Sequence, residues 1–216
     1  MSNVREAVLS KTQSGIYIEC VNNPESTLYN LPFLGKLGDD IDADRLKVAI
    51  EKTIKAHPCL STVIYTNDSG EVMQKIADDS IAVEVFEMTD EEFENVRGKL
   101  VRPFDINGGK LCRFEIYITP SAKYLFEDIH HIIFDGTSWG ILAADMRRAY
   151  DGEKLEIEEY TGIDVAADEA VLIGSDKYNS AKAFYEKLLD GCEGDCLPVR
   201  DVYDDTPKQG WLLHEF

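Results

Sequence analysis

The chain of 216 residues carries a formal net charge of −19, which argues against nucleic acid and anionic membranes as partners. With 44% hydrophobic and 29% charged residues it has the composition of a folded globular protein, so disorder is not expected. No apolar run is long enough to span a bilayer, and residues 1–6 lack the basic start and apolar core of a signal peptide. We therefore expect a cytoplasmic protein with one good-sized core or two small ones.

In the first half of the chain, capping residues and apolar periodicity predict alternating helices and strands. In chain order these are a helix over residues 9–20, a strand over 27–37, a helix over 42–57, a hairpin with strands over 60–65 and 71–76, a strand over 81–88 and a helix over 89–101. Ser10 or Thr12 is expected to cap the first helix, Asp42 the second, and Thr89 the third through a capping box.

His57 ends the second predicted helix. A helix carries partial negative charge at its C-terminal end, and a favourable interaction with this dipole explains an imidazole there. We therefore interpret His57 as a structural residue.

Pro103 breaks the third helix, and the chain then enters a strand that contains Arg113. Because Arg113 stands between Cys112 and Phe114, we expect it to be buried and paired rather than solvated. The remaining predictions in chain order are strands over 114–118 and 123–129, a helix over 137–150 opened by Thr137 or Ser138, an acidic surface loop to residue 170, a helix over 175–189 and a linker over 191–210.

The five cysteines are scattered along the chain at Cys20, Cys59, Cys112, Cys192 and Cys196. Their number is odd and no secretion signal is present, so reduced thiols are expected. Cys192 and Cys196 suggest a metal pair, but no second pair of cysteine or histidine residues lies near them, and a zinc site normally needs about four ligands. No metal site is therefore expected.

Two adjacent histidines, His130 and His131, lie where a predicted strand ends and a short loop leads into a helix. Adjacent residues of a strand point to opposite faces, so only one of the two readily faces a cleft. Gly136 lets the loop turn and lets other atoms approach the backbone. A histidine pair taken alone is more often structural, yet an imidazole at such a junction is suited to proton transfer.

The string His-His-x-x-x-Asp-Gly, made by His130, His131, Asp135 and Gly136, resembles the active-site motif of the condensation domains of nonribosomal peptide synthetases. These domains belong to the chloramphenicol acetyltransferase-like superfamily. Three other segments resemble family motifs in the same order along the chain: a Ser-x-x-Gln segment at Ser10 and Gln13, residues 56–62 without the two arginines of the family, and Pro-Phe-Asp at residues 103–105.

The resemblance implies an α/β fold of the chloramphenicol acetyltransferase-like type, a two-layer sandwich in which helices cover a mixed β-sheet. It extends over the N-terminal half of the family only. Residues 1–216 are thus expected to form the N-terminal lobe of a condensation domain whose C-terminal lobe is absent, with residues 191–216 as a linker toward that lobe.

The reaction that the resemblance implies is peptide bond formation. The amine of an acceptor aminoacyl thioester attacks a donor acyl thioester, and each group is carried on the 4′-phosphopantetheine arm of a carrier protein. His131 would be the catalytic residue that orients or deprotonates the amine. His130 and Asp135 would hold the loop, Asp135 in an ion pair with Arg113, and Gly136 would line the tunnel near the thioester.

The implied partners are donor and acceptor peptidyl carrier protein domains and the C-terminal lobe, and no cofactor is expected to bind the chain directly. Since the family's chemistry takes place between two lobes, this chain alone is expected to be inactive. Two alternatives stay open. One is an epimerisation domain of the same fold, favoured by Ser138 and Trp139 after the motif. The other is a non-catalytic lobe that only docks carrier proteins.

Overall fold

The computed structural model describes residues 6–78 and 81–191, which divide into two units at Ser175. The first unit contains both β-sheets and five of the six α-helices described here, while helix α6 (Asp176–Leu188) is the described part of the second unit. The predicted linker lies outside the described residues except for Gly191, and so do Cys192 and Cys196.

A four-stranded mixed sheet forms the centre of the first unit. Its strand order is β2 (Asn30–Lys36), β7 (Lys123–His130), β6 (Cys112–Ile118) and β5 (Val83–Glu87). The β2–β7 and β7–β6 pairs are antiparallel, and the β6–β5 pair is parallel. The prediction of a mixed sheet is therefore confirmed.

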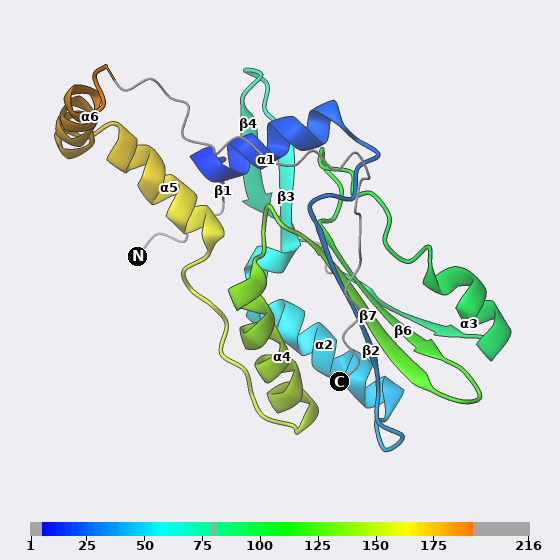
Figure 1. Ribbon diagram of the computed structural model, residues 1–216. Helices are drawn as coiled ribbons and strands as arrows, with labels where there is room; N and C mark the ends of the chain where they lie inside the picture. Colours follow the sequence, from blue (N-terminus) through cyan, green and yellow to red (C-terminus); the bar gives the residue numbers. More distant parts are fainter. Residues whose placement is uncertain (1–5, 79–80, 192–216) are drawn as a thin grey trace. The chain divides into compact units, whose positions relative to one another are not determined.

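Helices α2 (Ala43–Ala56) and α4 (Gly136–Tyr150) lie side by side against one face of this sheet (Figure 1). Their apolar residues join those of the strands in one core, because alternate residues of β6 and β7 point toward the two helices. The buried members of this core include Ile50, Leu142, Phe114 and Ile129. This is the helix-covered layer that the sequence predicts.

The opposite face of the sheet is covered in part by α3 (Asp90–Arg97). Phe93 is 1% exposed and packs against Tyr117 of β6 and Phe126 of β7. These two strand residues point to the sheet face opposite the one that α2 and α4 cover. Thr89 caps α3 through a capping box with Glu92, as predicted.

A second, three-stranded antiparallel sheet has the order β1 (Glu6–Val8), β4 (Val72–Ile76) and β3 (Thr62–Thr66). The predicted hairpin is β3 and β4, and it follows a short 3-10 helix at Pro58–Ser61. Strand β1 was not predicted, since three residues carry too little alternation to be recognised. Helix α1 (Lys11–Asn22), capped by Ser10, packs Ile16 and Tyr17 against the cluster that includes Ile64 of β3.

Helix α5 (Gly162–Ile173) occupies a segment that the sequence predicts as an acidic loop, and that prediction is wrong. Thr161 and Asp164 form a capping box at its start. Ile163 and Ala166 are each 1% exposed and pack against Ala7 of β1. The burial of one narrow apolar stripe therefore outweighs the acidic composition of the segment. Among the described residues, no helix has the length and apolar content needed to cross a membrane.

Candidate active site

The histidine pair lies at the end of β7, on the loop that leads into α4. His130 is the last residue of the strand and is 4% exposed, whereas His131 is exposed. The backbone N–H of His130 donates to the carbonyl of Leu111, and that of His131 donates to the carbonyl of Tyr29, each at 2.8 Å. The neighbouring chain segments thus fix the backbone of both residues, and only His131 is exposed, which agrees with the expectation that only one of the two readily faces a cleft.

His131 is oriented by the main chain of its own loop. Its Nδ1 lies 2.8 Å from the carbonyl oxygen of Phe134. A carbonyl only accepts hydrogen bonds, so Nδ1 carries the proton, and in the neutral ring Nε2 keeps a free lone pair. Nε2 has no hydrogen-bond partner among the described residues. The exposed edge of this ring is therefore able to accept a proton.

His130 has the opposite protonation pattern. Its Nδ1 accepts a hydrogen bond from the backbone N–H of Ile132 at 3.1 Å, so the neutral ring carries its proton on Nε2. Nε2 lies 3.5 Å from Sγ of Cys20. The rings of Phe104 and His130 pack edge to face, with their centres 5.8 Å apart. Burial, followed by the neighbouring His131, lowers the pKa of His130 to about 4. His130 is thus a neutral residue that holds the loop.

Asp135 is the N-cap of α4, in place of the predicted Thr137 or Ser138. Its Oδ1 accepts from the backbone N–H of Ser138 at 2.9 Å and from the Ser138 hydroxyl at 2.8 Å. These two hydrogen bonds, in that order, lower the pKa of the Asp135 carboxyl. The side chain is exposed and ties the loop to the first turn of the helix.

The predicted ion pair between Arg113 and Asp135 is wrong. Nη1 of Arg113 instead lies 3.1 Å from Oδ2 of Asp128, because these two residues are directly opposite each other in the β6–β7 register. Oδ2 of Asp128 also accepts from Nδ2 of Asn30 at 2.8 Å. Burial raises the pKa of Asp128, while the bond from Asn30 and then the charge of Arg113 oppose that rise. The prediction that Arg113 is paired with a buried carboxylate is correct, but the sequence did not identify the partner.

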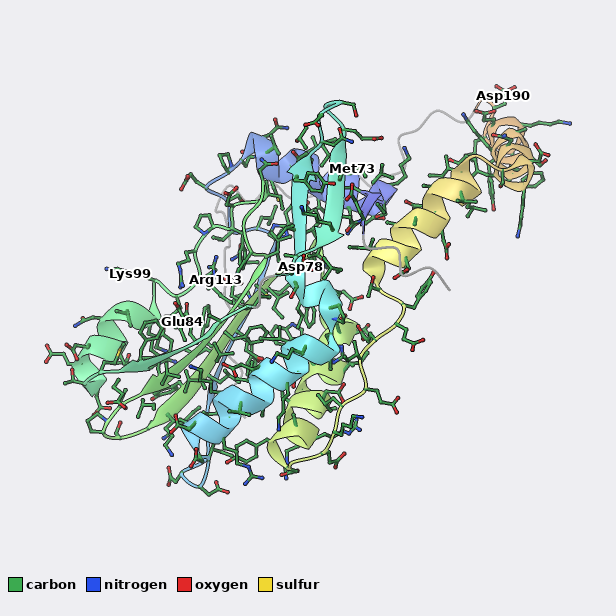
Figure 2. The ribbon with its side chains drawn as sticks, turned by 180° about the vertical axis from the view of Figure 1, so that it is seen from behind. Met73, Asp78, Glu84, Lys99, Arg113 and Asp190 are labelled. Carbon is green, nitrogen blue, oxygen red and sulfur yellow. The ribbon has the colours of Figure 1, made fainter. Side chains whose placement is uncertain are left out.

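Arg113 also anchors the segment that precedes β6. It is labelled in Figure 2, near the end of the four-stranded sheet. Its guanidinium donates to the carbonyl oxygens of Arg102 at 2.7 Å and Pro103 at 3.1 Å, and its Cζ lies 3.8 Å from the centre of the Phe104 ring. One arginine therefore joins the sheet to the Pro-Phe-Asp segment.

Gly136 is the first residue of α4 and is not among the glycines with positive φ, so the turn itself does not require glycine. A Cβ placed on it would have no heavy atom within 4 Å in the described residues. The backbone of Gly136 is exposed and is open to close approach from outside.

His57 is held by two carboxylates in addition to its place at the end of α2. Its Nε2 lies 3.0 Å from Oδ2 of Asp145, and its Nδ1 lies 2.9 Å from Oε1 of Glu158. His57 is 7% exposed, so these contacts join α2 to α4 and to the chain before α5. A structural interpretation fits this residue, with contacts to two carboxylates added to the helix dipole.

Glu127 is a buried carboxyl that the sequence analysis did not single out. It is 2% exposed, and its Oε1 has no hydrogen-bond partner in the described structure. Leu125 and Ile129 lie on the same side of β7 and belong to the core beneath α2 and α4. Burial raises the pKa of Glu127 to about 8. Its position between two apolar residues of the same face was the signal available in the sequence.

The family model described as Condensation domain matches residues 3–212 of the chain. The chain is 33% identical over 206 residues to surfactin synthase subunit 2 and 30% identical over 185 residues to surfactin synthase subunit 1, both from Bacillus subtilis (strain 168). These matches cover 93% and 85% of this chain and 5% of each synthase.

Solved structures with the same fold include the starter condensation domain of the rhizomide synthetase RzmA, with a TM-score of 0.74 and 17% identity. The first condensation domain of the calcium-dependent antibiotic synthetase, in complex with a substrate analogue, has a TM-score of 0.65 and 16% identity. The chain is covered to 88% and 87% by these matches and spans 49% and 48% of the two solved chains. The predicted fold class is confirmed.

Proposed function

This chain belongs to the condensation domain family, and from that membership we propose that it supplies one wall of an active site that joins an acyl donor to an aminoacyl acceptor. The bond formed is an amide. The chain spans about half of the solved condensation domains that it resembles, which supports its assignment as the N-terminal lobe, with the opposite wall coming from a second lobe.

The observation that carries this proposal is the geometry of His131. Its exposed ring is held through Nδ1 by the carbonyl of Phe134 at 2.8 Å, which leaves the Nε2 lone pair available for an incoming amine. A general base needs this combination of fixed orientation and a free acceptor within reach of the proton that it takes.

In the proposed reaction, the amine nitrogen of the acceptor attacks the thioester carbonyl of the donor. The new C–N bond forms, the C–S bond breaks, and the amine proton passes through Nε2 of His131 to the departing thiolate. Asp135 holds the loop in place by capping the start of α4. Gly136 has no side chain and no neighbouring atom near its Cβ position, which leaves room for the thioester. His131 is then the catalytic residue, while His130, Asp135 and Arg113 act through the structure.

Both reacting groups would be carried on 4′-phosphopantetheine arms of carrier proteins, so the chain itself needs no bound cofactor. RzmA structures with C8-CoA, and with C8-CoA together with Leu-SNAC, support substrates of this chemical type. Proximity of the two thioesters needs both walls of the site, so this chain alone would form no peptide bond.

The two alternatives have less support from the geometry. Ser138 donates a hydrogen bond to the carboxylate of Asp135. The ring centre of Trp139 lies 5.8 Å from that of Phe33 and 5.2 Å from that of Phe134. A structural role therefore accounts for both residues that favoured epimerisation. A purely docking lobe would have no need for an exposed histidine with a fixed tautomer.

The test is single-turnover dipeptide formation by a two-lobe protein that carries this chain, with two loaded carrier proteins. His131→Ala should reduce the rate by roughly 10²–10⁴-fold if the ring transfers a proton, with a smaller loss if it only positions the amine. Glu159→Gln, at an exposed position of the same chain, serves as the control and should leave the rate unchanged. An unchanged rate for His131→Ala, in a protein that folds normally, would remove this residue from the mechanism.

A further inference from the structure

A cavity of about 320 Å³ is lined by His130, at the end of β7, and not by His131. One wall is the C-terminal end of α1 with the residues that follow it to Ser26, and the other wall is the segment 103–107. Its volume is at the small end of the range for small-molecule sites, which is about 300–1,000 Å³.

The two walls are joined by side-chain contacts. The hydroxyl of Tyr17 on α1 donates to Oδ1 of Asn107 at 2.9 Å. Arg113 holds the other end of the 103–107 segment through the carbonyl of Pro103 and the ring of Phe104. The cavity is therefore built into the fold, with its walls already in place before any ligand binds.

The imidazole of His130, which is 4% exposed, lines the cavity. Because Nδ1 already accepts from the backbone of Ile132, the ring presents an N–H donor at Nε2. The only hydrogen-bond partner of Nε2 in the described structure is Sγ of Cys20 at 3.5 Å. Sulfur is a weak acceptor, so an oxygen atom of a ligand would bind this donor more strongly.

The charged residues that line the cavity are acidic. Two carboxylates, Glu25 and Asp105, line it, and no lysine or arginine does. Both side chains are exposed, and neither has an ion pair with a described residue. The apolar side chains of Val21, Phe104 and Ile106 line the cavity as well. The cavity thus combines a buried hydrogen-bond donor, apolar side chains and exposed negative charge.

We propose that this cavity binds a small primary ammonium compound that carries a carbonyl oxygen, the chemistry of an amino-acid amide or ester. The ammonium group lies at Glu25 and Asp105, the apolar side chain packs against Phe104, and the carbonyl accepts from Nε2–H of His130. The site goes beyond the proposed condensation reaction and does not depend on it, since that reaction is assigned to His131.

The probe is leucinamide, titrated into the 216-residue chain near neutral pH by calorimetry. For a ligand of this size we expect a dissociation constant on the order of 1 mM. Bound leucinamide should also cover Cys20. At about ten times the dissociation constant, alkylation of this thiol by iodoacetamide, followed on the peptide by mass spectrometry, should slow about tenfold.

Two analogues test the chemistry of the ligand. N-acetyl-leucinamide lacks the ammonium group, and 3-methylbutylamine lacks the carbonyl. Each should bind about tenfold more weakly than leucinamide, because each leaves either the carboxylates or the N–H donor of the cavity without a partner. Equal binding of either analogue would overturn the assignment of the group that it tests.

Variants at exposed positions test the location without disturbing the core. Glu25→Gln should weaken leucinamide binding about three- to tenfold, and Val21→Trp, which fills the cavity, should abolish it. Glu159→Gln removes the same charge from an exposed position that does not line the cavity and should leave binding unchanged. No binding by the parent chain, unchanged binding by Val21→Trp, or equal weakening by Glu25→Gln and Glu159→Gln would overturn the proposal.

Discussion

Nδ1 of His131 lies 2.8 Å from the carbonyl oxygen of Phe134, three residues further along the same loop. His130, its immediate neighbour, instead accepts a backbone N–H at Nδ1. The main chain of one short loop therefore sets opposite tautomers in two adjacent imidazoles. The exposed ring keeps a lone pair on Nε2, and the buried ring keeps a proton there.

These opposite tautomers are directly measurable. Long-range proton–nitrogen NMR spectra above neutral pH should show the proton on Nδ1 of His131 and on Nε2 of His130. As the pH falls, the His130 signals should stay those of a neutral ring until about pH 4, because burial lowers the pKa of His130 to about 4. The same tautomer in both rings would contradict the hydrogen-bond assignment.

His130→Ala should lower the free energy of unfolding by roughly 2–4 kcal/mol at neutral pH, because it leaves a cavity and removes the acceptor for Ile132. The parent should lose stability as the pH falls from about 6.5 to 4. In this range His130 binds a proton in the unfolded chain, where its pKa is 6.5, but stays neutral in the folded chain, where its pKa is about 4. The variant should lack this part of the acid sensitivity. Denaturant titrations at several pH values check both effects. If the free energies of unfolding of the parent and of His130→Ala changed in parallel with pH, the predicted role of His130 in the acid sensitivity would be contradicted.

Asp128→Ala should destabilise the chain by roughly 3–5 kcal/mol, since it removes the buried carboxylate that pairs with the half-buried Arg113 and leaves this charge with only the neutral carbonyls of Arg102 and Pro103. Asp135→Ala is the matched control, since it removes a carboxylate that only caps α4 and should cost about 0.5–2 kcal/mol. Chemical denaturation of the two variants measures the difference. A larger loss for Asp135→Ala would mean that the cap, rather than the ion pair, holds this region.

Glu127→Gln should stabilise the chain at alkaline pH. The folded protein keeps the proton of Glu127 up to about pH 8, whereas the unfolded chain releases it near the ordinary pKa of 4.5. The free energy of unfolding should therefore fall as the pH rises between these values, by on the order of 3–5 kcal/mol in total, and then level off. Glu127→Gln should not show this fall. The exposed Glu159→Gln should follow the parent, and a Glu127→Gln curve parallel to the parent would contradict a buried neutral carboxyl.

The sequence by itself determined the features that depend on neighbours a few residues apart. Asp42 and Thr89 cap their helices as predicted, and Ser10, one of the two candidates for the first helix, caps α1, because a cap bonds the backbone two or three residues onward. The burial of His130 beside the exposed His131 was likewise expected from two adjacent positions at a strand end. The resemblance to the family, too, was recognisable from short local motifs such as the one made by His130, His131, Asp135 and Gly136.

Tertiary structure alone decided which distant residues meet. Arg113 is paired with Asp128, not Asp135, because the β6–β7 register sets those two residues opposite each other. Glu127 became a buried carboxyl because α2 and α4 cover its side of β7, and residues 162–173 became a helix because β1 offers an apolar surface for Ile163. Strand register and helix docking are set by the summed burial of many side chains, and no single local pattern in the chain contains that sum.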